Sequence, residues 1–176
     1  MGDTDVTDVS PLAGSKSLVS INMNISPGIT DLSSLTGLTN LEDFSATLSD
    51  ITDISGLADA TKLRTLELCC NQIADISALA NLTELTSLTI NDNRIVDVSP
   101  LAKLTNLESA HLSENLIGGQ GVGHVDELVT LRNVRRLEVH HNPSMSCSEL
   151  QTLTDALGAP PVYAGGVEPG VTCSEP

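Results

Sequence analysis

One stretch of the chain, Leu63-Arg-Thr-Leu66-Glu-Leu68-Cys-Cys-Asn71-Gln-Ile73, returns 22 residues later as Leu85-Thr-Ser-Leu88-Thr-Ile90-Asn-Asp-Asn93-Arg-Ile95. A third copy runs from Leu107 to Ile117. Two earlier copies keep the apolar positions. One has Leu41, Phe44, Ala46 and Ile51, and the copy before it has Leu18, Ile21, Met23 and Ile29, with one extra residue. A fixed period of about 20–50 residues is typical of proteins in which each repeat buries its apolar side chains against its neighbours. The chain is therefore predicted to be a stack of repeats.

A second pattern lies between these copies and combines an aspartate, an apolar residue, a serine and a leucine. It occurs as Asp8-Val-Ser-Pro-Leu12, Asp31-Leu-Ser-Ser-Leu35, Asp53-Ile-Ser-Gly-Leu57, Asp75-Ile-Ser-Ala-Leu79 and Asp97-Val-Ser-Pro-Leu101. With the strand pattern L-x-x-L-x-L-x-x-N, residues 5–143 resemble the leucine-rich repeat family, in particular the 22-residue internalin type of bacterial surface proteins. The resemblance implies an α/β fold, a right-handed solenoid of β-strands and 3-10 turns with a parallel concave sheet of about six strands.

Elementary geometry agrees with that resemblance. Each L-x-L places two apolar side chains on one face of a short strand, and the residue between them points the other way. Four asparagines stand where the chain leaves a strand and are predicted to form a buried ladder, because a carboxamide both donates and accepts: Asn71, Asn93, Asn115 and Asn142. The serines of the second pattern are predicted N-caps of short helical turns on the convex side, namely Ser10, Ser33, Ser55, Ser77 and Ser99. The aspartate column is expected to cap backbone N–H groups rather than to bind calcium.

Two repeats depart from the pattern. Asn115 and Asn142 are 27 residues apart, so residues 115–142 form an irregular longer repeat with the added residues in 118–124. Helical spacing of the apolar residues downstream predicts an α-helix there: Val122, Val125, Leu128, Val129 and Val134. Ser49 replaces the ladder asparagine in one repeat, which predicts a weaker turn.

Residues 144–176 are predicted to be a C-terminal cap on a solenoid of residues 1–143. Ser146 or Ser148 begins a helix that ends at Leu157, and its apolar residues are expected to cover the open end of the last repeat. The chain begins in mid-repeat, so an N-terminal cap is expected to be missing, through truncation or a missing upstream segment.

The four cysteines fall into two pairs. Cys147 and Cys173 flank a segment rich in Pro and Gly, and a disulfide between them would indicate an oxidising compartment; two free thiols are the alternative. Cys69 and Cys70 are adjacent, so at least one faces solvent, and a vicinal disulfide, a soft metal and a reduced state all stay open. No metal site and no cofactor is predicted, because a metal would need further ligands and repeat phase places His111 and His140 strands away from the pair.

Composition excludes several classes of function. Eight Lys and Arg stand against 23 Asp and Glu, a formal net charge of −15 that repels the phosphate backbone of nucleic acids. No apolar run is long enough to insert into a membrane, and the sequence as given carries no leader. Gly119-x-Gly121-x-Gly123 lacks the Lys-Ser/Thr of a phosphate loop, and the histidines are expected on a smooth sheet without a nucleophile, so an enzyme is not predicted.

The outward residues of the sheet are the candidate ligand-binding site. The middle of this face is small and polar, and its charged side chains and histidines gather toward the C-terminal strands, with Arg94, Glu114 and His141 nearby. The candidates are Glu67, Thr89, Asn91, His111, Ser113, Arg136, Glu138 and His140.

The family resemblance implies a non-enzymatic recognition module of a secreted or cell-surface protein, which binds a protein or glycan through the concave face and is monomeric as an isolated domain. Two alternatives remain. One is an intracellular regulatory scaffold, similar to the phosphatase-binding repeat proteins, and the other is a structural stalk of a larger adhesin.

Overall fold

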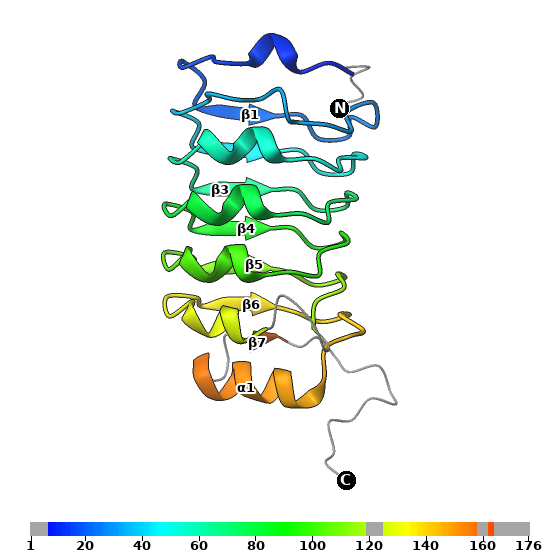
Figure 1. Cartoon of the computed structure of the whole chain (residues 1–176), viewed down its shortest axis with the longest axis vertical. Coiled ribbons are helices and arrows are strands. Elements are labelled where there is room, and N and C mark those ends of the chain that lie inside the picture. Colours follow the sequence, from blue (N-terminus) through cyan, green and yellow to red (C-terminus); the bar gives the residue numbers. More distant parts are fainter. Residues whose placement is uncertain (1–6, 119–124, 158–161, 164–176) are drawn as a thin grey trace.

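The computed structural model describes residues 7–118, 125–157 and 162–163. They form a single stack in which each repeat contributes one strand and one exit turn (Figure 1). The strands are β1 (Ser20–Asn22), β2 (Asp43–Ser45), β3 (Thr65–Glu67), β4 (Ser87–Thr89), β5 (Ser109–His111), β6 (Arg136–Glu138) and β7 (Val162–Tyr163). A 3-10 turn lies between consecutive strands from β2 to β6, whereas the turn expected at Ser33, between β1 and β2, is not helical. All seven strands lie in chain order in one parallel sheet, which confirms the predicted solenoid.

The register of the sheet follows the repeat. Leu66 pairs with Leu88 and Leu88 with Ala110, so residues in the same repeat position stand side by side. The apolar positions of each repeat point inward, and Leu66, Leu68, Leu88 and Ile90 are fully buried. Burial of such a side chain stabilises the fold by roughly 1.5–3 kcal/mol, so the stacked leucines and isoleucines are the main source of stability.

Short helical turns cover the opposite side of the core. The 3-10 turns are η1 (Ser10–Leu12), η2 (Ser55–Asp59), η3 (Ser77–Asn81), η4 (Ser99–Lys103) and η5 (Val125–Thr130). The prediction of an α-helix in the irregular repeat is therefore wrong for its described part, because η5 is a 3-10 turn. The rest of the predicted helix, including Val122, falls in residues 119–124, outside the described residues. Val125, Leu128 and Leu131 are all buried, and their spacing of three also suits a 3-10 turn. The hydroxyl of Thr130 donates to the carbonyl of Ala102 at 2.8 Å, which joins η5 to η4.

The caps of these turns differ from the prediction in one respect. The serines are the first residues of η1 to η4 rather than N-caps, and the residues before η2, η3 and η4 make no side-chain cap bond. The aspartate two residues upstream takes that role, as its carboxylate accepts the serine N–H at 2.6–2.8 Å in all five copies. In the Asp31 copy, hydrogen bonds from the Ser33 side chain and backbone lower the pKa of the aspartate.

A row of buried asparagines lies at the exits of the strands. The Oδ1 atom of Asn93 accepts the N–H of Ile73 at 3.0 Å, and its Nδ2 donates to the carbonyls of Leu68 at 2.9 Å and Ile90 at 3.1 Å. The same pattern of bonds recurs at Asn71, Asn115 and Asn142. At the substituted position the Ser49 hydroxyl accepts the N–H of Ser26 at 3.1 Å and donates to Thr47 at 3.4 Å.

The residue before each ladder position adopts a left-handed backbone conformation. Among the residues that the structure describes, six other than glycine have φ between 53° and 61°: Ile25, Leu48, Cys70, Asp92, Glu114 and His141. This conformation is uncommon for such residues and persists only where the surroundings fix it. We call these six the left-handed turn positions.

The C-terminal segment covers the end of the stack. Helix α1 (Cys147–Leu157) begins with a capping box, in which Ser146 Oγ accepts the N–H of Glu149 at 3.3 Å and Glu149 accepts the N–H of Ser146 at 2.7 Å. Leu153 is fully buried, and Leu150 and Leu157 contact the core. Strand β7 then pairs with β6, an extension that the sequence did not predict. The domain boundary at residue 143 stays a prediction.

Within the described part of the chain, no helix combines the length and apolar character needed to cross a lipid bilayer.

Candidate functional site

The outward face of β5 and β6 carries a charged cluster made of predicted site residues. Glu138 lies at its centre, where one carboxylate oxygen accepts a hydrogen bond from Arg136 Nε at 2.8 Å. The other oxygen lies 3.6 Å from Nδ1 of His111 on the neighbouring strand. The Glu138 side chain is 16% exposed, whereas that of Arg136 is 56% exposed, so the arginine reaches into solvent above a largely covered carboxylate. We call these three residues the β5–β6 cluster.

A second group of candidates lies where the chain leaves β5 and β6. Ser113 Oγ is 2.8 Å from Nδ1 of His140, and the His140 and His141 rings meet edge to face with centroids 4.9 Å apart. Nδ1 of His141 lies 3.9 Å from a Glu114 oxygen. Ser113, predicted as an outward contact residue, is buried at 2% exposure and hydrogen-bonded to the His140 ring, so it supports that histidine instead of forming an open surface.

The remaining predicted contact residues lie on earlier strands. Glu67 is exposed on β3 and accepts a hydrogen bond from Ser45 at 2.9 Å, while Thr89 and Asn91 are half-buried near β4. The Ser45 hydroxyl also lies 2.8 Å from Oδ1 of Asn24 and shares its one proton between the two acceptors, so a polar network that the sequence did not predict extends toward β1. Ser45 occupies the repeat position of the candidates Glu67 and Thr89, and Asn24 occupies that of the candidate Asn91. These shared repeat positions are the signal in the sequence that could have revealed the network. The eight predicted residues therefore form separate groups along one face.

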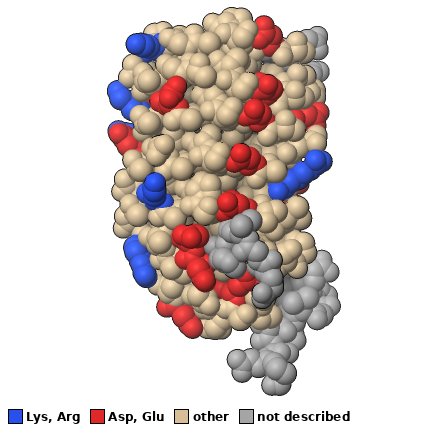
Figure 2. Space-filling view, in the orientation of Figure 1, with Lys and Arg blue, Asp and Glu red and all other residues tan. Residues whose placement is uncertain are grey.

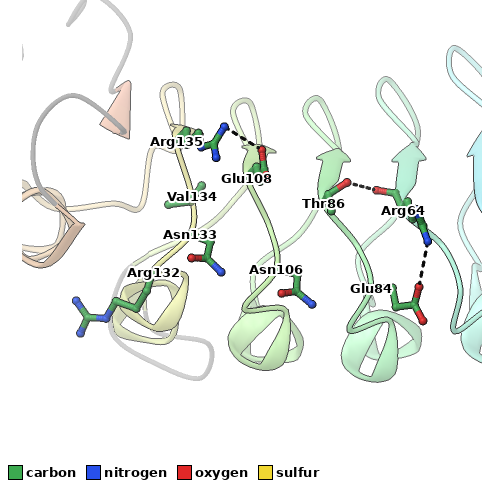
Figure 3. A pocket seen from close by; sticks show the side chains of 9 residues that line it. All are labelled: Arg64, Glu84, Thr86, Asn106, Glu108, Arg132, Asn133, Val134 and Arg135. Atoms are coloured by element: carbon green, nitrogen blue, oxygen red, sulfur yellow. Dashed lines mark hydrogen bonds and ion pairs between the residues drawn. The ribbon is translucent and has the colours of Figure 1, made fainter.

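A pocket of about 620 Å³ lies at the other edge of the sheet, where the chain enters the strands (Figure 3). Its lining comes from segments between a helical turn and the following strand and includes three arginines. Arg64 pairs with Glu84 at 3.9 Å and Arg135 with Glu108 at 3.4 Å, with all four side chains at least half exposed. The remaining arginine, Arg132, donates to a backbone carbonyl of α1 at 2.9 Å. Exposed pairs of this kind contribute little energy, and three arginines against two glutamates leave the pocket lining with a formal charge of only +1.

Charge is unevenly distributed on the side that bears the helical turns. Figure 2 shows a row of acidic side chains down its right-hand part and most of the visible Lys and Arg along its left-hand edge. Aspartates that precede the 3-10 turns add to the acidic groups of the chain, while Lys103 of η4 is the one basic residue in the last turn of a described 3-10 turn.

The cysteines Cys69 and Cys70 are free thiols at the exit of β3. The pKa of Cys70 is raised to about 12, chiefly by burial and further by Cys69 and Asp92. The vicinal disulfide left open by the sequence is therefore not formed in the structure. Cys147 is disulfide-bonded. Its expected partner Cys173 lies outside the described residues, so the pairing stays a prediction.

Comparison with known proteins gives one family and several solved structures. A family model for leucine-rich repeats in two copies matches residues 61–103. A comparison with curated proteins finds no significant match.

The solved structures include two internalins of Listeria monocytogenes. Internalin C2 is 30% identical, with a TM-score of 0.73 over 87% of this chain and 65% of its own. A second internalin is 31% identical, with a TM-score of 0.60 over 85% of this chain and 49% of its own. A plant peptide hormone receptor, solved in complex with its peptide, is 22% identical, with a TM-score of 0.58 over 72% of this chain and 21% of its own. The chain thus spans about half to two thirds of the two internalins.

Proposed function

Since this chain is a leucine-rich repeat protein of the internalin type, we propose that it is a non-enzymatic recognition module that binds a protein partner through the outward face of β5 and β6. The observation that carries this proposal is the β5–β6 cluster, in which Arg136 pairs with a largely covered Glu138 carboxylate and His111 lies 3.6 Å from that carboxylate. Proteins of this fold are generally interaction scaffolds rather than enzymes. The plant receptor named above binds a peptide on the same fold.

The cluster suits recognition because its charges are held in place before a partner arrives. Arg136 and His111 contact the same carboxylate from two strands, which limits the freedom of all three side chains. Ser87 and Ser109 are half-buried outward residues next to the cluster, so a partner can approach the sheet closely. A partner that covers the cluster removes water from an Arg136–Glu138 ion pair that is already formed, which favours specificity over raw affinity.

Charge also limits the kind of partner. The formal net charge of −15 disfavours nucleic acids and other polyanions. We therefore infer a protein partner with basic groups at its contact surface, and we expect association to slow as salt screens the attraction. Glycan binding is the less favoured reading.

The proposed setting is secreted or cell-surface, with the module acting as a monomer. The disulfide at Cys147 and the likeness to internalins support an oxidising environment. Peptide mapping of protein alkylated without reduction, from its native source, tests this. A linked Cys147–Cys173 fragment is expected, whereas alkylation of both thiols would favour the intracellular scaffold.

Binding is tested by crosslinking the wild-type chain to cells and to their extracellular proteins, beside the double variant His111→Gln/Glu138→Gln. Glu127→Gln, an exposed substitution on η5 at the far side of the core, is the matched control. We expect one protein to be recovered by the wild type and the control but not by the double variant, with equal melting temperatures. Equal recovery by all three would refute binding through the cluster, and no selective recovery would favour the stalk. Recovery that is lost after deglycosylation of the cells would favour a glycan.

A further inference from the structure

Glu114, His140 and His141 form a group that the recognition function does not use. Each offers one ligand atom, and these three atoms all lie within 4.8 Å of one another. We propose that these three residues bind a divalent transition-metal ion, with Zn²⁺ as the representative case. Two imidazole nitrogens and one carboxylate oxygen are a donor set that Zn²⁺ takes in sites with three protein ligands and an open fourth position.

The backbone brings the three side chains together from two neighbouring repeats. Glu114 and His141 occupy consecutive left-handed turn positions, with φ of 57° and 53°. The N–H of Glu114 donates to the carbonyl of His140 at 3.0 Å, which ties one turn to the next. The ladder residues Asn115 and Asn142 follow directly and are hydrogen-bonded in the core, so the Cα positions of the ligands are fixed.

The side chains retain enough freedom to close around an ion. With metal–ligand bonds of about 2.0–2.2 Å, the ligand atoms of a tetrahedral site stand roughly 3.3–3.5 Å apart. The observed separations therefore require small side-chain rotations. Glu114 and His141 are 51% and 52% exposed at their side chains, so solvent leaves room for these rotations.

His140 has the support expected of a metal ligand. Its Nδ1 lies 2.8 Å from the buried hydroxyl of Ser113, which leaves Nε2 as the ring nitrogen for an ion. Histidine ligands in metal sites commonly donate their other ring N–H to a neighbouring acceptor, which fixes the tautomer and the orientation of the ring. Ser113 is thus a positioning residue rather than a ligand.

The donor chemistry selects the class of metal. Calcium and magnesium prefer six or more oxygen ligands or several retained waters, whereas imidazole favours zinc, copper and nickel. No metal site was predicted from the sequence, where the cysteine pair was the candidate and the two histidines were not combined with the glutamate of the preceding repeat. Glu114 and His140 are 26 residues apart, so no short ligand motif marks them.

Calorimetric titration of the tag-free full chain with zinc chloride at neutral pH tests the proposal. Cys69→Ser/Cys70→Ser serves as the background, because free thiols also bind zinc. We expect one ion per chain, and no comparable binding of calcium chloride. His140→Gln, His141→Asn and Glu114→Gln should each weaken zinc binding at least tenfold, while Glu127→Gln, the matched carboxylate on η5, should leave it unchanged. Asn is chosen at 141 because it tolerates the left-handed conformation.

Ser113→Ala provides a second readout, since loss of such a supporting group weakens metal binding about tenfold or more while all three ligands remain. Equal melting temperatures without metal will show that the variants fold. The proposal is overturned if zinc does not bind at concentrations up to about 1 mM, or if zinc binds as tightly to the His140→Gln/His141→Asn double variant.

Discussion

Replacing Asn93 with alanine is expected to lower the free energy of unfolding by about 3 kcal/mol, because one ladder side chain bonds to four backbone groups, three of them at 3.1 Å or less. The N–H of Ile73, fully buried, bonds to Asn93 Oδ1 and is left without that acceptor, at a cost of roughly 1–3 kcal/mol. The carbonyls of Leu68 and Ile90 each lose one bond but keep another, from Asn71 and Asn115, so each loss costs only about 0.5–1.5 kcal/mol.

Urea unfolding followed by circular dichroism measures this difference. Asn106→Ala is the matched control, because the exposed Asn106 makes one side-chain bond, from Nδ2 to the carbonyl of Thr83 at 2.9 Å. That variant should cost no more than about 1 kcal/mol, as water replaces the lost donor. If the Asn93 and Asn106 variants unfold at the same urea concentration with the same slope, the ladder does not stabilise the turns in the way argued.

Two further predictions concern single residues elsewhere. Because the pKa of Cys70 is raised to about 12, against about 8.5 for an unfolded cysteine, its thiol stays protonated at mildly alkaline pH. Cys70 should therefore react with iodoacetamide much more slowly in folded than in urea-unfolded protein. Equal rates of alkylation, measured by peptide mass spectrometry, would contradict this. Ser146→Ala removes one half of the capping box and should destabilise α1 by about 1 kcal/mol. We expect the backbone amides of residues 147–157 to exchange faster in Ser146→Ala than in Ser144→Ala, an exposed control. Equal exchange rates in the two variants would show that the cap contributes nothing.

Much of the fold could be predicted from the sequence because the repeat ties local pattern to packing. The alternation of Leu66, Glu67 and Leu68 specifies which residues are buried, and 22-residue spacing specifies their partners on the next strand. The aspartate caps were also predicted, because a short carboxylate just before a helical turn readily accepts hydrogen bonds from the free backbone N–H groups at the start of that turn.

The failures share a physical cause, which is dependence on contacts between segments. Residues 125–131 fit a 3-10 turn and an α-helix equally by spacing, and packing on η4 favours the shorter form. Strand β7 has only two residues, and its pairing with β6, not its own pattern, makes it a strand. Ser113 was taken as outward because its column is outward, but the ring of His140 covers it from 27 residues away.

The asparagine ladder also restricts where the chain can change in length. Asn71, Asn93 and Asn115 each bond to an N–H that lies 20 residues earlier, whereas Asn142 bonds to Ile117, 25 residues earlier, at the same 3.0 Å that Asn93 and Asn115 show. The five added residues therefore lie, in sequence, between one strand exit and the next strand, and the described strand exits stay in step. Insertions there leave the pitch of the outward face at about 4.8 Å per strand. A partner that touches several strands must consequently present its own groups at multiples of that pitch, whichever side chains the sheet displays.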